Sequence, residues 1–458
     1  MLDSLSCQTI FKLSQYNTIC MNSNLSETIS GTKRFKYGSL ILVFVLFSNI
    51  CFGQLPPELQ NPELVSINRM PMRANAFAFE NWASANGFDK EKSANFLSLN
   101  GEWKFNWVQD PNKRPIGFYE SSFDDSKWGL FKIPASWEVN GYGLPIYVNQ
   151  PYDFAGHNLR YGKMNPPYDI PANNNPVGSY RKKIFLPKEF KGKQVFLHVG
   201  NAKSCLFVWV NGKKVGYSED SKLAAEFDIT NYLIEGENLI GFQVFRWSDA
   251  SYLECQDMFR FSGIERDVYL FATNKLNIRD FKIKAELDQQ YENGLLDVKV
   301  EVDNYKLEKG YLSKKDSFNI EVQLKDISGK TIFQERTKDF ATVLGNYHSF
   351  ISFKTSIPNV KAWSAESPYL YTLYLILKNK EGDVLEIIPQ RVGFKKIEII
   401  GSNFLVNGKR IFLKGVNRHE HHPRNGHVLS KEDMLKDMEM MKKLNINAVR
   451  HSHYPPDP

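Results

Sequence analysis

Three segments of this 458-residue sequence gather the side chains that could carry chemistry: residues 246–258, 415–423 and 447–455. The first segment places Asp249 and further carboxylates beside aromatic rings, a combination that hydrogen-bonds sugar hydroxyls and stacks on sugar rings. Such an acid also caps turns in solvated loops, and composition alone leaves the two interpretations equal. The segment therefore supplies candidates for a carbohydrate site.

Histidines dominate the other two segments. Residues 419–422 read His-Glu-His-His, and residues 451–453 read His-Ser-His. Zinc binding is one interpretation, but the spacing is not that of the helical HExxH motif. His419 and His421 lie on the same side of the chain only where the chain is extended. We favour imidazoles that hydrogen-bond substrate hydroxyls and strengthen those bonds in a charged transition state.

Both histidine segments follow short apolar runs, at residues 411–413 and 446–450. Between them, Ser430 and Asp433 have the spacing of a capping box, and apolar residues recur at helical spacing over 434–444. Strand, helix and strand in this order predict a βαβ unit, with the histidines at the carboxyl ends of parallel strands, where α/β barrels build active sites. Two strands cannot close a barrel, so we expect the sequence to stop inside a domain.

The preceding part of the chain has the two-residue period of β-strands. Short strands from about residue 96 to 274, including the hairpin signal Asn211-Gly212, predict an all-β sandwich. A second set of alternating runs predicts an immunoglobulin-like sandwich. We place the domain limits at 56–275, 276–396 and 397–458.

The composition is that of an ordinary globular protein, with 42% hydrophobic and 24% charged residues. The net charge of +7 is spread along the chain without a dense Lys/Arg block. Nucleic-acid binding needs such clustering on one face, so we exclude it.

Residues 1–53 have the order of an export signal: a basic patch at 32–37, a short apolar run and the small residue Gly53. A single membrane anchor is the alternative. We expect cleavage, a periplasmic or extracellular location and no membrane attachment afterwards. Only Cys205 and Cys255 lie outside this leader, which is too few for a disulfide scaffold and leaves open one bridge or two thiols.

Taken together, residues 246–249, 256–258, 262–264, 415–423 and 447–455 resemble glycoside hydrolase family 2, and within it the β-galactosidases. The resemblance covers about residues 60–458. It implies a multidomain protein with a jelly-roll sugar-binding β-sandwich, an immunoglobulin-like β-sandwich and the first strands of a (β/α)8 TIM barrel. It also implies retaining hydrolysis of terminal non-reducing β-D-galactose residues in β-galactosides such as lactose.

The resemblance assigns roles to four residues of this sequence. Asn149 and Asp249 match residues that hold the galactosyl group, and Asp249 is similar to one that also ligates sodium. His419 and His453 match barrel histidines that contact the sugar. His451 departs from the family, which has a small residue there.

The family's two catalytic glutamates and most ligands of its divalent cation, magnesium or calcium, are expected beyond residue 458. We therefore expect the chain to be an amino-terminal fragment without activity of its own, since retaining hydrolysis needs both carboxyl groups. The resemblance allows a homo-oligomer for the complete enzyme. Two alternatives stay open: a family 2 β-glucuronidase or β-mannosidase, and a non-catalytic carbohydrate-binding protein.

Overall fold

The computed structural model describes residues 55–148, 169–305, 317–338 and 348–458. The predicted export signal (residues 1–53) and Asn149 lie outside these ranges. None of the helices within them has both the length and the apolar character needed to span a bilayer.

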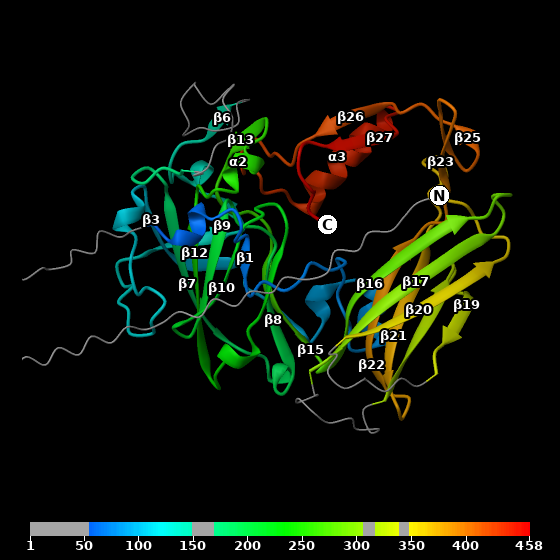
Figure 1. The fold of residues 1–458 in the computed structure, drawn as a ribbon, viewed down its shortest axis with the longest axis horizontal. Helices are drawn as coiled ribbons and strands as arrows, with labels where there is room; N and C mark the ends of the chain where they lie inside the picture. Colours follow the sequence, from blue (N-terminus) through cyan, green and yellow to red (C-terminus); the bar gives the residue numbers. More distant parts are fainter. Residues whose placement is uncertain (1–54, 149–168, 306–316, 339–347) are drawn as a thin grey trace, which may run out of the picture. The chain divides into compact units, whose positions relative to one another are not determined.

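The first part of the chain is the predicted β-sandwich (Figure 1). One sheet has the order β1-β10-β9-β12-β7-β3-β4 and the other the order β11-β8-β15-β2, and all pairings are antiparallel. The strands of the larger sheet are β1 (Ser66–Ile67), β10 (Lys213–Ser218), β9 (Cys205–Val210), β12 (Glu237–Phe245), β7 (Val177–Phe185), β3 (Gly101–Val108) and β4 (Gly129–Ile133). Those of the smaller sheet are β11 (Ala225–Asp228), β8 (Gln194–Val199), β15 (Val268–Thr273) and β2 (Phe96–Ser98).

The turn predicted at Asn211-Gly212 is confirmed. It joins β9 to β10, with Val210 opposite Lys213. Both turn residues have positive φ, 50° and 83°, as a two-residue hairpin turn of type I′ requires. Asparagine and glycine adopt that conformation at the lowest cost, which is why this dipeptide predicts the hairpin.

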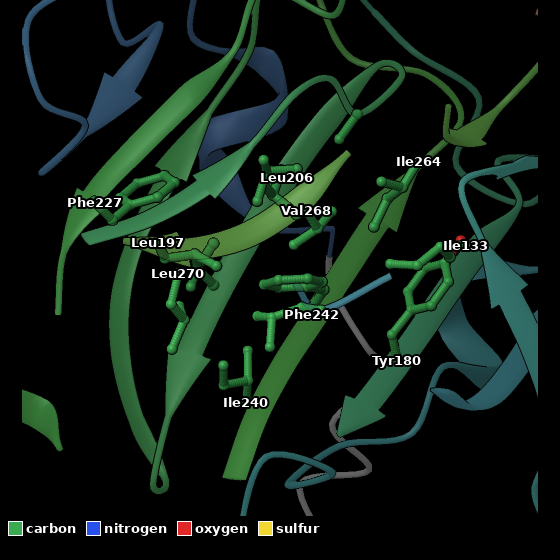
Figure 2. Close-up of a cluster of buried hydrophobic side chains, with 14 of the residues drawn as sticks. Ile133, Tyr180, Leu197, Leu206, Phe227, Ile240, Phe242, Ile264, Val268 and Leu270 are labelled. Atoms are coloured by element: carbon green, nitrogen blue, oxygen red, sulfur yellow. The ribbon is translucent and has the colours of Figure 1, made fainter. Parts of the chain in front are cut away.

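The core lies between the two sheets, and Figure 2 shows side chains from both pointing toward one another. Leu197 and Leu270 come from the smaller sheet, and Ile240 and Phe242 from the larger one. The indole of Trp103 stacks on Phe242 with ring centroids 4.8 Å apart. Neither Cys205 nor Cys255 forms a disulfide, so this packing holds the sandwich without a bridge.

Gly178 on β7 gives a direct test of the packing of this core. A Cβ atom there would lie 2.4 Å from Cζ2 of Trp137 and 2.9 Å from Cε2 of Phe105. Overpacking of this kind costs about 1–3 kcal/mol, so we expect Gly178→Ala to lower the free energy of unfolding by that amount. Gly129→Ala on β4 is the matched control, because no atom lies within 4 Å of its added Cβ. Equal urea midpoints for the two variants would contradict the packing described here.

The second sandwich is the predicted immunoglobulin-like unit (Figure 1). A three-stranded sheet, β16-β17-β20, and a four-stranded sheet, β19-β18-β21-β22, enclose a core of aliphatic residues and buried rings. The strands are β16 (Leu276–Leu287), β17 (Gly294–Asn304), β20 (His348–Ile357), β19 (Thr331–Arg336), β18 (Phe318–Lys325), β21 (Tyr371–Asn379) and β22 (Val384–Val392). The short helix α1 (Trp82–Gly87) packs beside β22.

The last segment begins with a hairpin and continues as the predicted βαβ unit. The hairpin strands are β23 (Ile397–Ile400), β24 (Asn403–Val406) and β25 (Lys409–Arg410). Strand β26 (Gly415–Arg418) pairs in parallel with β27 (Ala448–His451), and α3 (Lys431–Lys443) connects them. The capping box of Ser430 and Asp433 is present, as predicted.

One local expectation for this unit was wrong. The strand lies at 415–418 and not at 411–413, because the Asn447 side chain binds the amide of Lys414 and the parallel pairing starts after it. No residue of α3 is buried, so the apolar residues of this helix are left uncovered by the described part of the chain.

Candidate functional site

A small two-stranded sheet places an acid and two aromatic rings beside the first sandwich. Strand β13 (Met258–Arg260) pairs antiparallel with β6 (Ile146–Val148), with Phe259 opposite Tyr147. The Tyr147 hydroxyl donates to Oδ1 of Asp257 at 2.6 Å, and its ring meets Phe259 edge-on at 5.1 Å. Tyr147 is 54% exposed, so this ring and carboxylate face solvent, where a ligand can reach them.

The parallel pairing of β26 and β27 brings the two histidine segments together. His419 follows β26 directly, His453 follows β27, and their ring centroids lie 5.6 Å apart. Burial and then the charge of His453 lower the pKa of His419, whereas the carboxylate of Asp257 raises it. Two imidazoles and an acid from distant parts of the sequence therefore lie close enough to interact electrostatically.

His421 links the histidine segment to β13. Its imidazole stacks on the Phe259 ring, with centroids 5.1 Å apart and an angle of 10° between the planes. It also lies 6.0 Å from Phe261. We define the histidine site as Tyr147, Asp257, Phe259, His419, His421 and His453.

Asp249, predicted for the same site, lies in a different pocket. That pocket holds about 400 Å³ and includes none of the histidines. Its lining residues are Pro62, Val65, Arg69, Glu219, Asp220, Asp249, Ala250, Tyr252, Leu253 and Glu254. The structure thus brings together His419 and His453, while neither of them lines the pocket beside Asp249. Asp257 belongs to the segment 256–258 that carries the resemblance, but the sequence alone did not assign it to the sugar site.

Asp249 and Glu219 form a buried carboxyl pair. Both residues are nearly inaccessible, and among the described side chains only Glu219 hydrogen-bonds to the carboxylate of Asp249. Burial, followed by the interaction with Asp249, raises the pKa of Glu219 to about 9. A buried carboxylate whose side-chain partner is a second acid offers the oxygen ligands that a hard cation prefers. The residues present therefore fit the cation that the resemblance implied for Asp249.

Because of this carboxyl pair, the free energy of unfolding depends on pH. The folded protein keeps the Glu219 proton up to about pH 9, whereas the ordinary pKa of this group is 4.5. Between these values the folded state binds more protons, so stability falls as the pH rises. We expect Glu219→Gln to make this decrease in stability with pH less steep when unfolding is measured with chelator and without sodium.

The measurement compares urea midpoints at about pH 5.5 and about pH 8.5. Glu63→Gln, an exposed residue, is the matched control and should keep the wild-type slope. A Glu219→Gln variant with the wild-type slope would show that Glu219 is ionised at neutral pH.

Glu420, the one acid within the two histidine segments, has a structural partner. It is buried, and its Oε2 accepts from Nη2 of Arg266 at 2.8 Å. The backbone amide of Asp457 donates to its other oxygen at 2.6 Å. With both oxygens occupied, Glu420 joins the barrel segment to the first sandwich.

Comparison with known proteins covers all three parts of the chain. Residues 96–274, 276–395 and 397–458 match the models "Glycosyl hydrolases family 2, sugar binding domain", "Glycosyl hydrolases family 2" and "Glycosyl hydrolases family 2, TIM barrel domain". A β-galactosidase of Priestia megaterium is 40% identical over 88% of this chain and 38% of its own length. One of Halalkalibacterium halodurans is 39% identical over 87% and 37%.

A solved structure shows the same fold. The β-glucuronidase of Bacteroides uniformis superposes with a TM-score of 0.65 at 24% identity, over 79% of this chain and 40% of that one. The chain spans less than two fifths of the length of the two curated relatives named above.

Proposed function

Because the chain belongs to family 2 of the glycosyl hydrolases, we propose that the protein it forms part of is a β-galactosidase. The proposed reaction is retaining hydrolysis of terminal non-reducing β-D-galactose residues. The observation that carries it is the 40% identity to a β-galactosidase over 88% of the chain. The histidine site supports it, because carboxylates, imidazoles and exposed rings are groups that bind sugars.

The residues of this chain would supply the floor of the sugar site. The Asp257 carboxylate, held by the Tyr147 hydroxyl, accepts hydrogen bonds from galactosyl hydroxyls. His419 and His453 accept hydrogen bonds from sugar hydroxyls, which become stronger donors as positive charge develops on the sugar. The acid/base and nucleophile glutamates, whose carboxyl groups lie about 5–5.5 Å apart in retaining enzymes, would come from residues beyond 458.

The separate effects of a substitution on kcat and on KM test the role of the histidines. If His419 and His453 act in the transition state, His419→Ala or His453→Ala in the complete enzyme lowers kcat and kcat/KM together. A rise in KM at constant kcat would show ordinary binding of the ground state instead.

We also propose a cation in the Asp249 pocket, with Glu219 and Asp249 among its ligands. Sodium or a divalent ion such as magnesium or calcium suits these oxygens. When bound, the ion supplies positive charge that orders the carboxylates. Asp249 then affects the binding of the sugar through this ion and not by direct contact. Asn149 remains a proposed contact of the galactosyl group. We also propose that the protein is exported and that the complete enzyme is a homo-oligomer.

The decisive experiment is an assay of the product of the complete reading frame. Aryl β-galactoside is compared with aryl β-glucuronide and aryl β-mannoside at equal concentration. A β-galactosidase prefers the first by kcat/KM. Preference for either of the others would assign another family 2 activity, and turnover of none would favour the carbohydrate-binding alternative.

A further inference from the structure

One sheet of the second sandwich carries three potential metal ligands on one face. Glu301 and Asp303 are two positions apart on β17, so their side chains lie on the same side of the sheet. His348 on β20 stands directly opposite Asp303 in the antiparallel register. The fold of this sandwich alone brings the three side chains together, independently of the sugar site.

The three side chains converge on one ring nitrogen. Nδ1 of His348 lies 2.5 Å from Oδ1 of Asp303 and 3.0 Å from Oε1 of Glu301. Each residue offers a ligand atom, and these atoms all lie within 4.8 Å of one another. The Asp303 side chain is 4% exposed, that of Glu301 25% and that of His348 49%. The cluster is therefore anchored on one side and open to solvent on the other.

A neutral imidazole has a single proton to share between the two carboxylates. If that proton is on Nε2, the Nδ1 lone pair faces two negative groups without a cation between them. The neighbouring acid Asp280 adds to the negative field at Glu301, which a protonated His348 and then Arg279 oppose. A cation placed between the three ligand atoms would remove this repulsion.

We propose that Glu301, Asp303 and His348 bind a divalent transition-metal ion of the Zn²⁺ class. An imidazole with two carboxylates suits such an ion, whereas Mg²⁺ and Ca²⁺ prefer oxygen ligands throughout. Ligand atoms bound tetrahedrally at about 2.0–2.2 Å to one ion lie about 3.3–3.6 Å apart. Nδ1 of His348 and Oδ1 of Asp303, now 2.5 Å apart, would therefore separate by about 1 Å to admit the ion, and the partly exposed Glu301 would rotate to complete the site. The open side leaves room for water as a fourth ligand.

The site has a structural consequence within the sandwich. Ligands from β17 and β20 tie two neighbouring strands of one sheet, so the ion stabilises the folded sandwich by mass action. This role does not depend on the proposed glycosidase activity.

The test is titration of the metal-free chain with Zn²⁺, followed by calorimetry and by the shift in melting temperature. We expect one Zn²⁺ ion to bind at this site and raise the melting temperature, whereas any shift that Mg²⁺ produces through the Asp249 pocket should be the same in the wild type and in His348→Ala. His348→Ala should abolish this binding, and Glu301→Gln, which preserves side-chain volume, should weaken it at least tenfold.

Two control variants separate this site from other zinc ligands. Glu335→Gln, an exposed acid on the other sheet of the sandwich, and His422→Ala, in the barrel segment, should both keep the binding. Circular dichroism of the metal-free variants checks that each one folds. Zinc binding that survives in both His348→Ala and Glu301→Gln, or is lost in His422→Ala, would overturn the proposal.

Discussion

Replacing Arg266 by methionine is expected to lower the free energy of unfolding by about 3–5 kcal/mol, because it leaves a buried carboxylate without its cation. The Arg266 and Glu420 side chains are 6% and 4% exposed, and their ion pair spans 2.8 Å. The guanidinium also donates to the carbonyls of Lys222 and Pro455. One side chain therefore stabilises both the barrel segment and the first sandwich, which makes this loss large.

The measurement combines urea unfolding with hydrogen exchange at the amides of β26 and β27. The double variant Arg266→Met, Glu420→Leu should recover much of the loss, since an apolar pair can replace a buried ion pair. Lys354→Met is the matched control: its pair with Asp297 is at the surface, with the lysine 71% exposed, and is worth at most about 1 kcal/mol. A loss below 1 kcal/mol for Arg266→Met would mean that water reaches the Glu420 carboxylate.

In the complete enzyme, Asp257→Asn is expected to lower kcat/KM for an aryl β-galactoside about a hundredfold, or about 2.7 kcal/mol. The amide keeps the shape of the side chain but loses the charge that accepts hydrogen bonds from sugar hydroxyls and acts on His419. Asp249→Asn should cost less, about tenfold, and the loss should depend on the cation concentration. Steady-state kinetics over a range of sodium and magnesium concentrations measures both.

Tyr147→Phe is the matched control for this experiment. It removes only the hydroxyl that donates to Asp257 and keeps the ring beside Phe259. An intermediate effect is expected, because the carboxylate remains but is less well oriented. If Asp249→Asn is the more damaging change at every cation concentration, the galactosyl contact lies in the Asp249 pocket and not at Asp257.

Several features of this protein could be predicted from the sequence, because they depend on residues that are close together along the chain. Alternation of apolar and polar residues gave the strands of both sandwiches, and Asn211-Gly212 fixed a hairpin through its positive φ angles. The spacing of Ser430 and Asp433 defined the start of α3. A βαβ unit puts the ends of its two parallel strands together, so the meeting of His419 and His453 also followed from sequence.

The choice between acids depended on tertiary structure. Asp249 and Asp257 are eight positions apart in one segment, yet only Asp257 acts on His419, while Asp249 pairs with Glu219. Glu420 stands among histidines in the sequence but pairs with Arg266, 154 positions earlier. Spacing along the chain determines which side chains share an element. The packing of distant elements determines which charged groups are buried and which partners they meet. It therefore also determines whether a carboxylate is free to bind sugar, can hold a cation or joins two domains.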